Sequence, residues 1–512
     1  MTPLRALPFV ALACLSLNSQ AAPQAAPVFA DHIVLQRDMP VPVWGTADPG
    51  AEVSVKFRDQ TQSTKADAHG KWMLKLDALQ AGGPDELQIG TTRISDILVG
   101  EVWVGSGQSN MAMSTGGVIK NDPVLADMAA KIYPTIRIGS ATGSWRVANS
   151  SKGSISAPAL PLAFAIRLQE ELKVPVGVIV GCVPGSSTTY WLTSEHLQAD
   201  PACQAAIQRY GAEVLPGLKE RYAKTLADWE PPPKASDPKS KPVAPAEAGM
   251  PSLAHHVTGK FFEQHIRPAI PYAIHGILWD QGENTSSIKG PDQTEIMHAL
   301  IQGWRKDWSQ GELPWVFIQK PSAGGCAFNL EAPLNRGAEP FAPLPEKTPG
   351  LKDGLYRELF LNILKTTPKT AMAIASDLSP GLHPPMKSSY ATRAARAARA
   401  ALALSYDQQL VIYGPLFSGH QIDGSSVRIG FDHTGKGLTF KGGDKLQGFM
   451  IAGADRKFVW ADAAIDGNDV IVSSPAVPSP ASVRYAWSNK CPWANLFNQD
   501  GLPAQSFRTD KW

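Results

Sequence analysis

The fold is decided by residues 97–111, which read ILVGEVWVGSGQSNM. The apolar run from Ile97 to Val104 is typical of a strand buried on both faces of a parallel sheet. A glycine-rich segment follows and carries Ser109 where a helix is expected to begin. Glycines permit a tight turn there, and backbone N–H groups at the start of the next element can face a developing negative charge. The stretch therefore predicts an α/β domain with a functional loop after its first strand.

Beyond this stretch, strands alternate with helices, which is the pattern of a mostly parallel sheet covered on both faces. The further expected strands are Thr135–Ile138, Val176–Val180, Ile274–Trp279, Trp315–Ile318 and Ala371–Ala375, and the expected helices include Leu162–Leu172, Glu295–Trp308 and Ser388–Tyr406. Short apolar runs split by turn signals precede and follow this region and predict β-domains. We expect a signal peptide over 1–22, a β-sandwich over 23–95, the α/β domain over 96–407 and a C-terminal β-domain, also a sandwich, over 408–512.

The N-terminus has the features of an export signal. Arg5 supplies a positive charge, Leu7–Leu17 is largely apolar, and small residues near Ala22 offer a cleavage site. This predicts a periplasmic or secreted protein, with a lipid anchor at Cys14 as the weaker alternative. Beyond the signal, no apolar run is long enough to span a bilayer. A net charge of +2 gives no reason to expect nucleic acid as a partner, and the sequence assigns no oligomeric state.

Cysteine usage gives no indication of a metal site. Four cysteines follow the signal, without Cys-x-x-Cys or zinc spacing, and they allow two disulfides whose pairing the sequence does not define: Cys182, Cys203, Cys326 and Cys491.

Four polar clusters follow expected strands, where ligands of open α/β sheets bind. They are residues 105–110, 182–186, 280–284 and 376–384. This convergence predicts a single site. A serine hydroxyl needs a neighbouring base, and the best candidate base is His383, with an ordinary pKa of about 6.5. Asp377 could orient its imidazole and stabilise the cation.

The sequences GQSNM (107–111), WDQGE (279–283) and LHP (382–384) resemble motifs of the sialate O-acetylesterase family, a branch of the SGNH hydrolases. The family's motifs are typically GQSNM, WYQGES and IHP. Further similar blocks lie at 177–191, 266–277 and 495–504, in the family's order. The resemblance implies a three-layer α/β/α, flavodoxin-like domain and hydrolysis of acetyl esters on sugars through an acetyl-enzyme. It implies neither a metal nor an organic cofactor.

Within this resemblance, Ser109 is the nucleophile and His383 is the base. The oxyanion donors would be the backbone N–H groups of Ser109 and Gly185 and a side-chain amide, from Gln281 or alternatively from Asn284. Glu283 is expected to fix the loop rather than to act as an acid.

Two departures from the family pattern bear on these roles. Pro184 replaces a glycine next to Gly185 and removes a backbone donor there. Pro380 stands three residues before His383, where many SGNH enzymes have an aspartate, so a Ser-His dyad is the alternative to a triad completed by Asp377.

The acetylated carbohydrate could be a sialic acid or a plant polysaccharide such as xylan. A rival hypothesis of another class is a non-catalytic carbohydrate-binding protein on an esterase scaffold.

Two groups of residues outside these motifs invite a functional interpretation. The arginines at 393, 396 and 399 follow helical spacing among alanines and predict a solvated helix face. Trp191 and Trp279 lie near the expected site and could either stack on sugar rings or belong to the core. The spacing of Trp304 and Trp308 favours the core.

Overall fold

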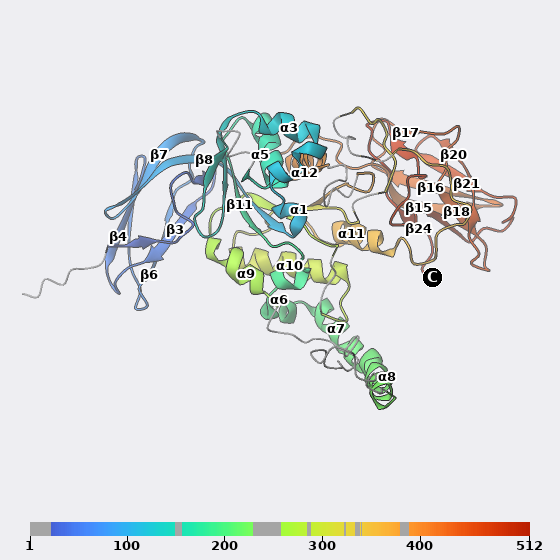
Figure 1. Ribbon diagram of the computed structural model, residues 1–512, viewed down its shortest axis with the longest axis horizontal. Helices are drawn as coiled ribbons and strands as arrows, with labels where there is room; N and C mark the ends of the chain where they lie inside the picture. Colours follow the sequence, from blue (N-terminus) through green and yellow to red (C-terminus); the bar gives the residue numbers. More distant parts are fainter. Residues whose placement is uncertain are drawn as a thin grey trace, which may run out of the picture.

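The computed structural model describes residues 22–148, 156–228, 258–283, 288–321, 324–332, 338, 340–378 and 389–512. Figure 1 shows an N-terminal β-domain at one end of the long axis, an α/β part in the middle and a C-terminal β-domain at the other end. Helix α8 (Leu215–Ala227) extends away from the middle part. The expected signal peptide lies outside the described residues, apart from Ala22.

The middle part is built on a sheet in the order β10-β9-β11-β8-β12-β13-β14. All neighbouring pairs along this path are parallel except β10 with β9. The strands are β8 (Thr92–Gly107), β9 (Tyr133–Gly139), β10 (Arg146–Ala148), β11 (Val176–Cys182), β12 (Gly276–Asp280), β13 (Trp315–Ile318) and β14 (Thr370–Ala373). The expectation of a largely parallel sheet is confirmed, and each expected strand lies within a few residues of an observed one.

Helices cover both faces of this sheet (Figure 1). Trp103 and Val178 pack with α3 (Pro123–Ala129), α5 (Ala159–Leu172) and α12 (Tyr390–Ser405). Val104 and Ile277 belong to the cluster on the other face, with α9 (Lys260–His265), α10 (Gln293–Trp308) and α11 (Leu355–Thr366). Successive strand residues alternate between the faces, so the continuous apolar runs in the sequence are explained. The remaining helices are α1 (Ser109–Ala112), α2 (Thr115–Val118), α6 (Ser194–Ala199) and α7 (Pro201–Arg209), with 3₁₀ turns at Ile119–Asn121, Thr188–Trp191 and Arg267–Ala269 and a π-helix at Tyr210–Val214.

The N-terminal β-domain shares a strand with the middle part. The first half of β8 pairs with β2 (Val34–Gln36) and β7 (Gly82–Ile89), and the second half belongs to the central sheet. The other strands are β1 (Gln24–Ala25), β3 (Val41–Thr46), β4 (Glu52–Phe57), β5 (Gln60–Lys65) and β6 (Lys71–Leu76). The boundary expected after residue 95 therefore falls inside β8. One apolar cluster includes residues of both parts, such as Val55 of the N-terminal β-domain and Trp304 of the middle part.

The C-terminal domain has its own apolar core, which includes Val470 and Phe449. One sheet has the order β15-β16-β21-β20, a second has the order β19-β18-β22-β24, and β17 pairs with β23. The strands are β15 (Leu416–Asp423), β16 (Ser426–Asp432), β17 (Leu438–Phe440), β18 (Phe449–Ala452), β19 (Val459–Trp460), β20 (Asp462–Asp466), β21 (Asp469–Ser473), β22 (Ser482–Tyr485), β23 (Leu496–Asn498) and β24 (Phe507–Arg508). Arg508 binds both oxygens of Glu358 at 2.9 Å and so ties this domain to α11.

The arginines of α12 do not form the solvated face that their spacing predicts. Arg393 and Arg396 are 1% and 4% exposed. The reason is the position of α12, which packs on α5, β13 and β14 with its alanine-rich faces, so that arginines lie beneath the loops that follow the strands. The charge of Arg396 is matched within the protein by Asp377.

The tryptophans belong to the core. Trp191 and Trp279 are fully buried and form an edge-to-face pair with ring centroids 6.2 Å apart, so the sugar-stacking alternative is wrong for both. Trp304 and Trp308 are buried as their spacing predicts. Within the described ranges, no helix has the length and apolar character needed to cross a bilayer. The four cysteines after residue 21 are free thiols in this structure, without the two disulfides that their number allows.

Candidate active site

Three loops leave the central sheet at the same level. Gly107 at the end of β8 lies opposite Cys182 at the end of β11 on one side and Asp280 at the end of β12 on the other. The chain runs from β8 to one side of the sheet and later returns to the other, so β8 is the point at which the strand order reverses. Ligands bind at such points in open α/β sheets. The turn that carries Ser109 therefore lies between the two loops that the sequence analysis assigns to the site.

The backbone around Ser109 is fixed by both neighbouring loops. The N–H of Gln108 donates to the Asp280 carbonyl at 3.1 Å, and the N–H of Val183 donates to the Gly107 carbonyl at 3.1 Å. Gly107 has φ +137°, and a Cβ there would lie 2.2 Å from the Asp280 carbonyl oxygen. A glycine is therefore required at this position. Ser109 begins α1 and is half-buried.

Glu283 holds the residues on both sides of Ser109. Its Oε2 accepts a hydrogen bond from the Gln108 amide, and its Oε1 accepts one from Asn110 Nδ2 at 2.9 Å. Gln108 and Asn110 are 3% and 0% exposed, and the Tyr390 hydroxyl donates to Asn110 Oδ1 at 3.4 Å. A carboxylate accepts hydrogen bonds at both oxygens when it is ionised. Glu283 therefore joins the loop after β12 to the turn after β8.

One charged residue beneath this loop, Lys320, was missed by sequence reasoning. The Lys320 ammonium lies 2.5 Å from Asp280 Oδ1 and 2.6 Å from Glu283 Oε1, and the side chains of Lys320 and Asp280 are 0% exposed. Lys320 follows β13 by two residues, so it lies at the same sheet edge as the four polar clusters. A lone lysine directly after an apolar strand was the available signal.

The two acids of this cluster shift in opposite directions. Burial raises the pKa of Asp280, and the neighbouring Glu283 carboxylate adds to the rise despite Lys320. Burial also opposes ionisation of Glu283, but the charge and hydrogen bond of Lys320, a backbone hydrogen bond and the charge of Arg393 together outweigh it and lower the Glu283 pKa. Glu283 is therefore the acid that is held as a carboxylate.

The two expected oxyanion residues lie on the loops beside Ser109. Gly185 has φ +74°, a left-handed conformation that favours glycine, and follows β11. Gln281 is fully buried; its Oε1 accepts a hydrogen bond from the Thr188 hydroxyl and its Nε2 donates to the Ser186 carbonyl at 3.3 Å. Asn284, the alternative, lies outside the described residues.

The structure leaves the base undescribed but places its expected partner. His383 lies outside the described residues. Asp377, which follows β14 by four residues, is 0% exposed and binds Arg396 through both oxygens, at 2.6 and 2.8 Å. An acid that serves as the third member of a triad accepts a hydrogen bond from the imidazole. If Asp377 had this role, its carboxylate oxygens would accept hydrogen bonds from both the imidazole and Arg396.

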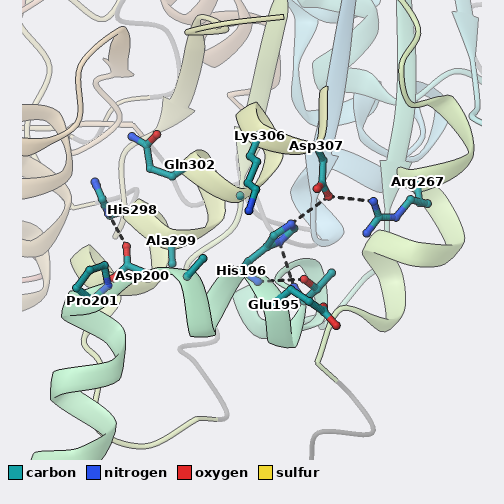
Figure 2. A pocket seen from close by; sticks show the side chains of 13 residues that line it. Glu195, His196, Asp200, Pro201, Arg267, His298, Ala299, Gln302, Lys306 and Asp307 are labelled. Carbon is teal, nitrogen blue, oxygen red and sulfur yellow. Dashed lines mark hydrogen bonds and ion pairs between the residues drawn. The ribbon is translucent and has the colours of Figure 1, made fainter. Parts of the chain in front are cut away.

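A cavity of about 530 Å³ next to α6 and α10 contains a second set of histidines and acids. Figure 2 shows His196 and Arg267 directed at Asp307, with 3.0 Å from His196 Nε2 to the carboxylate and 3.1 Å from the guanidinium. His196 Nδ1 accepts the N–H of Thr193 at 3.2 Å, so both ring nitrogens are engaged. His196 therefore has no nitrogen left to activate a nucleophile, and the pair stabilises the start of α6.

The residues of the Ser109 edge are hydrogen-bond donors, acids and a lysine rather than a ligand set for a metal. Within the described ranges, no three His, Cys, Asp or Glu side chains are grouped to hold a metal ion. The arrangement can place a hydroxyl beside backbone and amide N–H groups.

Comparisons with known proteins find similarity to esterases. No protein-family model matches it. Sialate O-acetylesterase from Mus musculus is 25% identical over 335 residues, which are 57% of this chain and 59% of that protein, so the match spans about three fifths of the relative. Sialate O-acetylesterase from Pongo abelii is 24% identical over 507 residues, 91% of this chain and 88% of that protein. The crystal structure of a carbohydrate acetylesterase from Xanthomonas citri superposes with a TM-score of 0.74 and 29% identity, covering 96% of this chain and 100% of that chain.

The motifs, their positions at the sheet edge and these similarities all indicate the same group of proteins. The similarity to sialate O-acetylesterases and to a carbohydrate acetylesterase supports the family that the motifs resemble.

Proposed function

We propose that this protein is a carbohydrate O-acetylesterase in which Ser109 is the nucleophile. The observation that carries the proposal is the position of Ser109, on a turn between the loops of Gly185 and Gln281 at the sheet's switch point. Without the edge strands β9 and β10, the order β11-β8-β12-β13-β14 is 2-1-3-4-5 in chain order, which is the flavodoxin-like order. With helices on both faces, this supports an SGNH-type three-layer catalytic domain.

The reaction has two half-reactions. Ser109 Oγ attacks the acetyl carbonyl while His383 accepts the hydroxyl proton; the Oγ–C bond forms, the C–O bond to the sugar breaks, and His383 returns the proton to the sugar oxygen. Water, activated by the same base, then releases acetate and restores Ser109. The negative charge on the carbonyl oxygen is met by the N–H groups of Ser109 and Gly185 and by the Gln281 amide, with Asn284 as the alternative. Removing one such donor typically lowers the rate by about 10²- to 10³-fold.

Of the two possibilities for the group behind His383, the contacts favour the dyad. Arg396 binds both oxygens of Asp377, and a buried carboxylate with this partner is already compensated. We propose that Asp377 anchors α12 to the loop that leads to His383.

The decisive experiment compares hydrolysis of p-nitrophenyl acetate by the wild type and by Ser109→Ala. We expect the variant to lose at least about 10³-fold in kcat/KM with an unchanged melting temperature. Equal rates would overturn the serine mechanism, and no hydrolysis by either protein would favour the non-catalytic carbohydrate-binding alternative.

The sugar is assigned by a second assay with the same pair of proteins. Acetate release from O-acetylated sialic acids and from acetylated xylan distinguishes the two expected substrate classes, because recognition of the sugar depends on loops around the site. Export through the N-terminal signal is tested separately, by determining the N-terminal residue of protein recovered from the periplasm or the medium.

A further inference from the structure

Lys320 lies below the loop of the candidate site, outside every motif that points to the family. Its ammonium is enclosed by protein and lies between Asp280 and Glu283. We propose that Lys320 is a positioning residue for Ser109, which acts by holding the Glu283 carboxylate against Gln108 and Asn110. This inference rests on the proposed serine mechanism.

The contacts form one continuous path from the ammonium to the nucleophile. Lys320 Nζ lies 2.6 Å from Glu283 Oε1, and the same oxygen accepts the Asn110 amide at 2.9 Å. The second oxygen accepts the Gln108 amide. Since Gln108 and Asn110 directly flank Ser109, a displacement of Glu283 moves the backbone that presents the hydroxyl.

The path depends on Glu283 being ionised. A protonated carboxyl group carries an O–H donor and loses part of its capacity to accept, so it could not serve two amide donors and an ammonium equally well. Within the part of the chain that the structure describes, the titratable and charged groups that bear on this charge are Asp280 on β12, Lys320 after β13, Tyr356 on α11, and Tyr390 and Arg393 on α12. Lys320 is the cation among them that contacts the carboxylate directly in the described contacts.

Lys320 has a second role in this cluster, because it also lies against Asp280. With a single ammonium between two acids, loss of Lys320 would leave the buried Asp280 and the partly exposed Glu283 side by side, and such a pair disfavours ionisation of either member. The Lys320→Met variant keeps much of the apolar stem and removes the charge. We therefore expect its kcat/KM to fall by about 10²-fold, the loss typical of a misplaced catalytic group.

The pH profile separates positioning from a merely structural role. In Lys320→Met the acidic limb of kcat/KM is expected to move to higher pH and to become steeper, because Glu283 must then lose a proton as well as the base. The matched control is Arg484→Met, which removes a cation from another buried ion pair, with Asp510 at 2.7 Å and both side chains 1% exposed. We expect the control to lower the melting temperature without moving the limb.

A double-mutant cycle provides the second test. If Lys320 acts through Glu283, adding Lys320→Met to Glu283→Gln changes kcat/KM by less than threefold, whereas independent effects would multiply. If Lys320→Met does not fold, Asp280→Asn and Glu283→Gln are compared instead. The asparagine variant is then expected to lose at least tenfold less activity, because it leaves the Lys320–Glu283 contact in place.

The outcomes are distinct from those for the proposed function. An unmoved acidic limb, multiplicative effects in the cycle, or equal losses in Asp280→Asn and Glu283→Gln would each overturn the role of Lys320 while Ser109→Ala remains inactive. Full activity in Ser109→Ala would overturn the proposed function itself, whatever the Lys320 variants show.

Discussion

Arg396 binds both carboxylate oxygens of Asp377, at 2.6 and 2.8 Å, in a region where both side chains are buried. Its Nη1 also donates to the Ile374 carbonyl at 3.0 Å, so the guanidinium connects α12 to the end of β14 and to the loop beyond it. Bidentate ion pairs of this kind have a fixed geometry, and removing one partner of a buried pair strongly destabilises the protein. Asp377 therefore has a demonstrable partner that does not depend on a catalytic role.

Asp377→Asn tests which of the two roles dominates. An uncompensated Arg396 is expected to lower the free energy of unfolding by about 3–5 kcal/mol. If Asp377 is an anchor, kcat per titrated active site falls less than tenfold, as measured with a serine-directed phosphonate that counts intact sites. A loss of about 10⁴-fold per titrated site would instead make Asp377 the third member of a triad.

Gly107 and Gly185 offer a matched pair of substitutions at the site. In Gly107→Ala the new Cβ would lie 2.2 Å from the Asp280 carbonyl oxygen, so β8 and β12 must separate. In Gly185→Ala the Cβ meets nothing within 4 Å, and the cost is the left-handed φ of +74°, about 1–2 kcal/mol. We expect Gly107→Ala to lose nearly all esterase activity, and to lose several times more free energy of unfolding than Gly185→Ala. Urea unfolding and p-nitrophenyl acetate turnover check both; comparable losses in the two variants would contradict this account.

The sequence predicts the sheet and its loops because both depend on local patterns. Apolar runs such as Ile97–Val104 are long enough to identify buried strands, and the ends of parallel strands meet at one edge. Contacts between residues distant in the chain could not be predicted in this way. Arg396 has the spacing of a solvated helix face, but α12 packs against the sheet and the charge of the buried Arg396 is compensated by Asp377, which lies on another element. Lys320 was overlooked for the same reason, because its partners follow a neighbouring strand.

Because the pKa of Glu101, near the middle of β8, is lowered, we predict that the free energy of unfolding falls in acid. Burial raises its pKa, but the contacts with His275 and Arg37 outweigh this and lower the pKa to about 2, from an ordinary value of 4.5. The group therefore contributes stability above pH 4.5 that is lost as the pH falls from 4.5 through 2, about 3 kcal/mol in total. Urea unfolding between pH 3 and 6 should show this slope in the wild type and a shallower one in Glu101→Gln. The control substitution is Glu86→Gln, at an exposed position outside this cluster.

The shared strand β8 predicts that the N-terminal β-domain cannot be removed. Deleting residues 22–91 takes away the partners of the first half of β8 and opens the apolar cluster that continues beneath the central sheet. It also removes the Val34 carbonyl that accepts the Tyr272 hydroxyl at 2.7 Å and the Val28 carbonyl that accepts Trp145 Nε1 at 3.1 Å, leaving buried donors unpaired. We expect the fragment 92–512 to be insoluble. For the chain from residue 22, we expect the unfolding transitions measured by tryptophan fluorescence and by circular dichroism to coincide, because β8 couples the two parts. A soluble 92–512 fragment with cooperative unfolding and esterase activity would show that the central sheet is complete without the first domain.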